Sequence, residues 1–286
     1  MTAEVPRIDV TRLLAPERDA LVELLRGLDD AAWRAPTECP AWTVKGLALH
    51  ILGDDLSLLS RQRDEATNGL IFYAESHPGL DFQPLLDGFN EQWVEAAMFF
   101  SPALLIELLR LSGEWTAAFY GSVDPDRSCE PVGFFGDRGR SATSPYWQAI
   151  AREYVERWVH QHQIRRALGH PDLGREFLEP AAAVVARSLA AHLPDIGAEP
   201  GTVLVLTVND VASWTCTLAD GGWSLVDGRS RDAAVELSLA QADATVVLSR
   251  GRGRDDARAA FRVSGDEALA ERALGVFSAM VAGGRQ

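Results

Sequence analysis

Hydrophobic positions in the first two-thirds of the chain repeat mostly with the period of an α-helix. Near the N-terminus they recur at spacings of three, four and seven, which is typical of a helix with one buried face; these positions are Ile8, Leu13, Leu14, Leu21, Leu24 and Leu25. Similar patterns predict further helices over about 43–68, 80–100, 102–120, 144–168 and 176–192. Thr43 is expected to cap the second of these helices, and Pro145 is expected in the first turn of the fifth.

The pattern changes after Pro194. Two segments rich in β-branched and aromatic residues, 202–208 and 212–218, predict strands, and 235–239 alternates as a half-buried strand does. Asp220-Gly221-Gly222 predicts a hairpin turn, and helices are expected over about 242–248 and 267–282, on either side of a last strand near 260–263. Strands followed by helices predict an α+β fold. We therefore expect two domains, a helical bundle over 1–193 and a small α+β domain over 194–286.

Charge and hydropathy exclude several classes of partner. The chain of 286 residues has 27 basic and 41 acidic side chains, a formal net charge of −14. This balance argues against binding to nucleic acid or to an anionic membrane surface. The N-terminus has no apolar signal core, so export is not expected. The longest uncharged apolar stretch, 96–106, is too short to cross a bilayer, which needs about 20 residues.

The three cysteines indicate the redox compartment. Cys39, Cys129 and Cys216 lie far apart and form no CxxC pair. This usage fits a reducing cytoplasm and argues against a disulfide framework or a cysteine-built zinc finger. We therefore expect a cytoplasmic protein. A packing role is expected for Cys39, with a reactive thiol as the alternative.

A pair of residues on the predicted helix over 144–168 has the spacing of metal ligands. Glu156 and His160 are four residues apart and project from the same helix face. A third ligand must come from elsewhere, and His50 is the candidate. Two imidazoles and a carboxylate suit zinc or another first-row divalent ion, and three protein ligands leave one coordination position open.

Each of these residues also has a simpler interpretation. Glu156 and His160 could form a solvated pair on a surface face, and His50 could be a hydrogen-bonded core histidine. Glu153 and His162 are competing ligands. His162 points to another helix face, where we expect solvent or a neighbouring helix, whereas Glu153 lies on the same face as His160 and is expected to be solvated or to support a ligand.

Two stretches of the sequence resemble the mycothiol-dependent maleylpyruvate isomerase family. Pro36–His50 is similar to that family's N-terminal signature, and Glu156–His160, followed by Ile164–Gly169, is similar to its second signature. The resemblance implies a DinB-like metal-binding four-helix bundle followed by a sterol-carrier-like α+β domain. It places the family's metal ligands on His50, Glu156 and His160, the positions also chosen from their chemistry. Family members usually have an acidic residue where this chain has Gln163.

The resemblance also implies the chemistry. Mycothiol, a small thiol, would serve as cofactor beside Zn²⁺ or another first-row ion, and its thiolate would add to a cis double bond conjugated with a carbonyl. Rotation and elimination would then give the trans product, and thiol transfer to an electrophile is the related reaction. The alternatives are a metal-dependent hydrolase with activated water and a non-catalytic binding protein.

Other residues are predicted to line the site. Trp42, next to the predicted metal helix, is expected to form a wall of the cofactor-binding pocket. Arg252 and Arg254, in a Gly-Arg-Gly-Arg segment preceded by Arg250, are the predicted catalytic residues, because guanidinium groups can bind a carboxylate. A solvated turn is the alternative for this segment. The small-molecule partners are an electrophilic substrate and a low-molecular-weight thiol.

Overall fold

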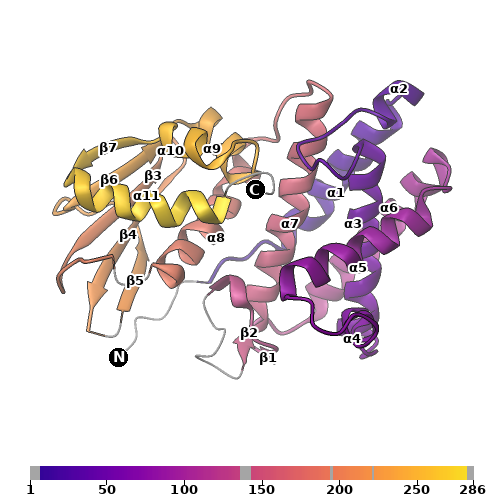
Figure 1. The fold of residues 1–286 in the computed structure, drawn as a ribbon, viewed down its shortest axis with the longest axis horizontal. Coiled ribbons are helices and arrows are strands. Elements are labelled where there is room, and N and C mark those ends of the chain that lie inside the picture. Colours follow the sequence, from indigo (N-terminus) through magenta and orange to yellow (C-terminus); the bar gives the residue numbers. More distant parts are fainter. Residues whose placement is uncertain (1–6, 136–142, 194–195, 221, 282–286) are drawn as a thin grey trace. The chain divides into compact units, whose positions relative to one another are not determined.

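The computed structural model describes residues 7–135, 143–193, 196–220 and 222–281. Over these residues the chain has a helical N-terminal region followed by a region that contains a five-stranded sheet (Figure 1), so the predicted α+β class is confirmed. Parts of three predictions lie outside the described residues: Gly221 of the hairpin turn, Pro194 at the domain boundary, and the last residue of the helix predicted to end at 282. Among the described helices, none is long and apolar enough to cross a bilayer.

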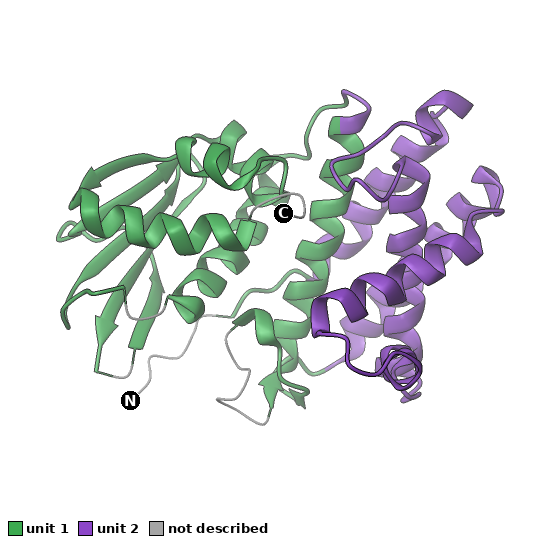
Figure 2. Cartoon of the chain, viewed as in Figure 1, with its two compact units in different colours: residues 1–10, 124–166, 170–286 green, residues 11–123, 167–169 purple. Residues whose placement is uncertain are grey.

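The chain divides into two compact units, which Figure 2 shows in different colours. Unit 1 contains residues 1–10, 124–166 and 170–286, and unit 2 contains residues 11–123 and 167–169. The predicted domain boundary at 193/194 was placed where helices give way to strands, and it stays a prediction.

Unit 2 is helical. Its elements are α1 (Thr11–Arg26), α2 (Asp30–Trp33), α3 (Val44–Leu58), the π-helical turn η1 (Leu59–Arg63), α4 (Gly69–Ser76), α5 (Phe82–Ala97) and α6 (Pro102–Ser122). Thr43 caps α3 as predicted, because its hydroxyl accepts a hydrogen bond from the Gly46 amide. The prediction that this helix continues to Asn68 was wrong. The α-helix changes to the π turn after Leu58, and Glu65 then adopts a left-handed backbone with φ of 56°.

A buried ion pair links three helices of unit 2. Arg18 of α1 donates a hydrogen bond to Asp55 of α3 at 2.6 Å, and Ser112 of α6 donates to the same carboxylate oxygen at 2.6 Å. Arg18 and Asp55 are 4% and 0% exposed, so their charges are neutralised by each other and not by water. The network anchors α3 in the unit.

Helix α5 docks on α3 through Trp93. The Trp93 indole donates a hydrogen bond to the Leu49 carbonyl at 2.8 Å. Its ring lies against Gly53, where a β-carbon would collide with the indole. A glycine in the middle of a helix costs about 1 kcal/mol relative to alanine, and here it provides room for the aromatic contact.

Unit 1 contains the sheet, with strand order β5-β4-β3-β6-β7. The strands are β3 (Val203–Val208), β4 (Ala212–Ala219), β5 (Gly222–Asp227), β6 (Val235–Leu239) and β7 (Arg262–Gly265); β3 and β6 are parallel, and the other pairs are antiparallel. Helices α8 (Arg175–His192) and α11 (Glu267–Val281) pack on one face of the sheet (Figure 1), and α9 (Gln241–Leu248) and α10 (Arg254–Ala259) complete this region. Alternate residues of β6 are buried, as predicted.

Helix α7 (Tyr146–Ala167) contains Glu156 and His160 and lies almost wholly in unit 1. The prediction that Pro145 belongs to its first turn was wrong. Ser144–Pro145 forms the short strand β2, which pairs with β1 (Ser128–Cys129), and the helix begins at Tyr146. The short 3-10 helix η2 (Gly133–Phe135) lies between these two strands in the chain.

Candidate metal centre

Glu156 and His160 lie on one face of α7, as their spacing predicts. Glu156 Oε1 is 3.2 Å from His160 Nε2. The other ring nitrogen, Nδ1, is 2.8 Å from the side-chain oxygen of Gln163. Because an amide oxygen can only accept, this contact places a proton on Nδ1.

The orientation of the Gln163 amide follows from its second contact. The amide nitrogen donates to the Ser249 carbonyl at 3.5 Å, and that carbonyl can only accept. The amide oxygen must therefore face His160. When His160 is doubly protonated, Nε2–H donates to the Glu156 carboxylate. When His160 is neutral, the Nε2 lone pair faces that carboxylate instead, and a cation can take the place of the proton.

Glu156 remains ionised although its side chain is half-buried. Burial alone would raise the pKa of this carboxyl group, but the hydrogen bond from a protonated His160, the charge of that ring and the positive charges of Arg152 and Arg250 outweigh it. The pKa therefore lies well below its ordinary value. A carboxylate that stays charged at neutral pH is suited to bind a divalent cation.

His50 is held in unit 2 by an aromatic neighbour. The imidazole, 7% exposed, stacks on the Trp42 indole with a centroid distance of 4.6 Å and an interplanar angle of 27°. The Trp42 N–H donates a hydrogen bond to Glu91 of α5 at 2.6 Å. Trp42 was predicted as a cofactor-binding residue, and this role stays a prediction. Its contacts with His50 and Glu91 were not predicted.

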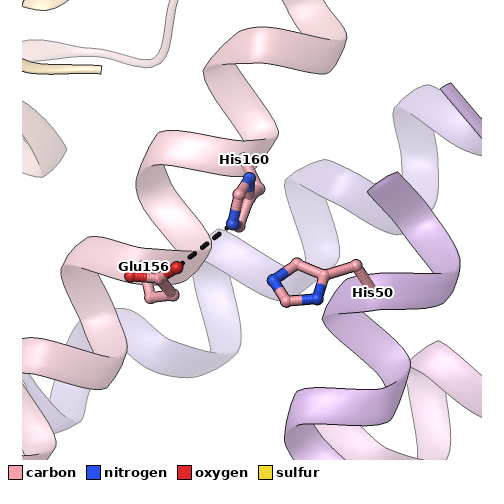
Figure 3. A group of neighbouring side chains, drawn as sticks. All are labelled: His50, Glu156 and His160. Carbon is pink, nitrogen blue, oxygen red and sulfur yellow. Dashed lines mark hydrogen bonds and ion pairs between the residues drawn. The ribbon is translucent and has the colours of Figure 1, made fainter. Parts of the chain in front are cut away.

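The three candidate ligands offer one nitrogen or carboxylate-oxygen atom each, and these atoms lie within 4.8 Å of one another. Figure 3 shows His50 on α3 and the Glu156–His160 pair on α7. His50 and His160 are buried, and Glu156 is half-buried.

The competing ligands have other partners. His162 is fully buried; its Nδ1–H donates to the Trp158 carbonyl at 2.8 Å, and its Nε2 accepts from the Leu173 amide at 3.3 Å. Burial lowers the pKa of His162 to about 4, so the ring is neutral at pH 7. Of the two alternatives expected for His162, the solvent-facing one is wrong. The solvated alternative for Glu153 is also wrong, because its buried carboxylate lies 2.6 Å from Arg152 Nη1, and a supporting role for Glu153 stays a prediction.

The predicted arginines lie in and after the segment that follows α9. Arg252 forms an ion pair with Asp243 at 2.6 Å, and Arg254 is the first residue of α10. A catalytic role for these two stays a prediction. Arg250 has a left-handed backbone with φ of 61°, and its charge lowers the pKa of Glu156. Sequence reasoning gave Arg250 no role, because the positive φ that turns the chain here has no signal in a non-glycine residue.

The chain has a helical N-terminal region and an α+β C-terminal region, and two histidines and a glutamate form a candidate metal centre. These features define the class of protein to which it belongs. Residues 14–165, more than half of the chain, match the family model described as the mycothiol maleylpyruvate isomerase N-terminal domain. The chain belongs to this family.

Solved structures show the same fold. Crystal structures of the mycothiol-dependent maleylpyruvate isomerase, and of a mutant of it with a histidine replaced by alanine, each match with a TM-score of 0.50 and 14% sequence identity. Each match covers 92% of this chain and 95% of the other. A comparison with curated proteins found no match.

Proposed function

We propose that this protein is a mycothiol-dependent enzyme that isomerises a maleylpyruvate-type substrate or transfers the thiol to an electrophile, using a divalent cation bound by His50, Glu156 and His160. The observation that carries the proposal is the convergence of one ligand atom from each of these residues within 4.8 Å. Membership of the family supports mycothiol as the thiol and a small electrophile as the substrate. The cytoplasmic location stays a prediction from the cysteines.

The three side chains fit a zinc-like cation. Two neutral imidazoles and one carboxylate are a common catalytic ligand set, and three protein ligands leave a position for a thiol or water. The contacts of His160 also fit, because Gln163 places the proton on Nδ1 and leaves the Nε2 lone pair for the cation. When bound, such a cation would deprotonate a coordinated thiol, so that the nucleophilic thiolate is present at neutral pH.

The residues around the candidate centre have separate roles in this proposal. Glu156 supplies the one negative charge of the ligand set. Gln163 fixes the tautomer of His160 without adding a charge. Arg250, whose positive charge acts on Glu156, would attract a carboxylate of the substrate and the enolate formed after thiol addition.

The two candidate reactions differ in the fate of the thiol. In the isomerisation, the thiolate adds to a carbon of the cis double bond, and the opposite elimination after rotation releases the thiolate unchanged. In the transfer, the carbon–sulfur bond persists and another leaving group departs with the electron pair. Catalytic amounts of thiol therefore support isomerisation, whereas transfer consumes one thiol per turnover.

Metal analysis tests the ligand assignment. We expect about one zinc-like ion per purified chain, and much lower occupancy in His50→Ala and Glu156→Ala. His170→Ala is the matched control, because His170 is exposed and outside the ligand set. Normal metal content in both ligand variants would contradict the assignment.

Turnover with and without thiol tests the chemistry. We expect conversion of a maleylpyruvate-type substrate only when mycothiol is present. Conversion without thiol would instead favour a metal-dependent hydrolase or another water-based reaction. If no turnover is found and His160→Ala still binds the ligand, the non-catalytic interpretation is favoured.

A further inference from the structure

Glu91 lies outside the ligand set but reaches it through one aromatic side chain. Its carboxylate accepts the Trp42 N–H at 2.6 Å, and the same indole stacks on His50. All three residues belong to unit 2, and Glu91 lies on α5, whereas His50 lies on α3. A contact with the ring of His50 therefore depends on a residue 41 positions away in the sequence.

Hydrogen bonds fix the backbone of Trp42 on both sides, so that only the orientation of its indole ring needs a further contact. The Trp42 amide donates to the Cys39 carbonyl at 2.8 Å, and the Thr37 hydroxyl donates to the Trp42 carbonyl at 2.7 Å. The side chain lies over Gly46 in the first turn of α3, where a β-carbon would press on the indole. The hydrogen bond to Glu91 then restrains rotation about the two side-chain torsions of Trp42.

The stacking geometry explains how this restraint acts on His50. A centroid distance of 4.6 Å and an angle of 27° define a nearly parallel stacked pair, an arrangement that aromatic rings favour when they are offset. The imidazole can rotate only by losing contact with the indole face. A ligand has to be held within about 0.5 Å and 10–20° of its productive geometry, and the indole supplies such a constraint on one side.

We propose that Glu91 is a positioning residue, which fixes the Trp42 indole by a charge-assisted hydrogen bond and through it holds the His50 imidazole in its ligand orientation. The part of this proposal that concerns the cation rests on the proposed function. The part that concerns ring orientation stands on the contacts within unit 2.

Ring-current shifts test the orientation without any metal. In metal-free protein labelled at its six histidines, we expect the His50 ring protons to be displaced by the indole, with His50→Asn used to assign them. Glu91→Met should move these resonances toward unstacked values, whereas Glu91→Gln, which keeps an acceptor oxygen, should preserve them. Glu95→Met is the matched control, because Glu95 is an exposed glutamate one turn further along α5.

Zinc affinity, measured by competition with a chelating dye, tests the consequence. We expect Glu91→Met to weaken zinc binding about tenfold, the lower end of the range for lost outer contacts, and Glu91→Gln and Glu95→Met to bind as the natural chain does. Trp42→Phe, which keeps a stacking ring but has no N–H, should lose a similar amount. The double variant Glu91→Met/Trp42→Phe should lose little more zinc affinity than either single variant, because both substitutions remove the same hydrogen bond.

The outcomes separate the two levels of the proposal. Unchanged His50 resonances in Glu91→Met, with thermal unfolding showing a folded protein, would overturn the positioning role. Shifted resonances with unchanged zinc affinity would also overturn it, since the orientation would then not matter to the cation. Failure of the natural chain to bind zinc would contradict the proposed function, while the resonances would still test ring orientation.

Discussion

At the scale of single residues, Gln163 determines which nitrogen of His160 is available to a ligand. A carboxylate in the same place would also accept the Nδ1 proton, but it would add a negative charge beside Glu156. In the proposed site, the neutral amide would keep the candidate ligand set at one negative charge, so that a bound cation would remain more electrophilic. The amide is itself held by the Ser249 carbonyl of unit 1.

Replacement of Gln163 should change metal affinity. Gln163→Met removes the acceptor while keeping side-chain length, so we expect zinc affinity to fall by about 10- to 100-fold, measured by dye competition. Gln163→Glu should bind zinc at least as tightly as the natural chain. Gln83→Met, at an exposed position, is the control. Unchanged affinity in Gln163→Met would show that the hydrogen bond does not support the ligand.

The cysteines should differ in reactivity. Burial raises the pKa of Cys216 to about 12, so its thiolate fraction at pH 8 is about one in ten thousand. We expect a thiol reagent to label Cys39 and Cys129, which are half-buried, and to reach Cys216 only after unfolding. Peptide mapping by mass spectrometry checks this. Rapid labelling of Cys216 in the folded protein would contradict the buried position.

Single residues could be predicted where chemistry and local spacing agree. Glu156 and His160 are one helical turn apart, and the sequence therefore indicated that they share a face. The Trp42–Glu91 hydrogen bond could not be predicted, because it joins residues 49 positions apart whose contact depends on how α5 docks on α3. The sequence could not decide between solvent and a neighbouring helix for His162, because its burial is set by packing around α7.

At the scale of secondary-structure elements, the position of α3 depends on the buried Arg18–Asp55 pair. The guanidinium also donates to the Leu109 carbonyl at 2.7 Å, so that one side chain links α1 to both α3 and α6. Removal of one partner from a buried ion pair leaves an uncompensated charge, which costs far more than the pair contributes.

We therefore expect Arg18→Met to lower the free energy of unfolding by about 3–5 kcal/mol, measured by urea denaturation. The double variant Arg18→Met/Asp55→Leu should lose less than the sum of its single variants, since no charge is left buried. Arg26→Met, on the exposed end of α1 where its side chain is 54% exposed, should change stability by about 1 kcal/mol or less. A small loss in Arg18→Met would show that Asp55 finds other compensation.

Elements with a clear period were predicted, and those without one were missed. The long helices and the strands β3, β4, β6 and β7 follow patterns of helical or alternating burial, so that their existence was predicted and only their ends differed. Strand β5 and the short strands β1 and β2 were not predicted. Helix α4 gave no such signal, because all eight of its residues are described and none is buried. The π turn after α3 was missed because hydrophobic period does not distinguish it from the α-helix before it.

At the scale of the whole molecule, a bound cation should stabilise the fold. A ligand that binds only the folded state stabilises it by about 2.7 kcal/mol at 100 times its dissociation constant. For a chain of this size, each kcal/mol of stabilisation raises the unfolding temperature by about 2–4 °C. We therefore expect chelator-treated protein to unfold at a temperature roughly 5–10 °C lower than zinc-loaded protein. Scanning calorimetry measures the difference, and Glu156→Ala should show almost none. An equal response in Glu156→Ala would place the stabilising ion elsewhere.

The fold class followed from the sequence because the change from helical to alternating patterns is strong near residue 194. The division into compact units could not be obtained in this way. Unit 1 includes α7 and residues 1–10 along with the sheet, and this grouping depends on contacts between distant segments. Periodicity describes which face of an element is buried, but not which neighbour buries it.

The two glycines of α3 have a consequence for exchanging parts between related chains. Gly46 and Gly53 are seven residues apart, two helical turns, and form recesses for the indoles of Trp42 and Trp93. Consider a chimera that takes α5 from a homologue whose tryptophan lies one helical turn before or after the position of Trp93. Its indole would press against a side chain of α3 and not against the recess at Gly53. Successful recombination should therefore inherit residues 42–53 and α5 from the same parent.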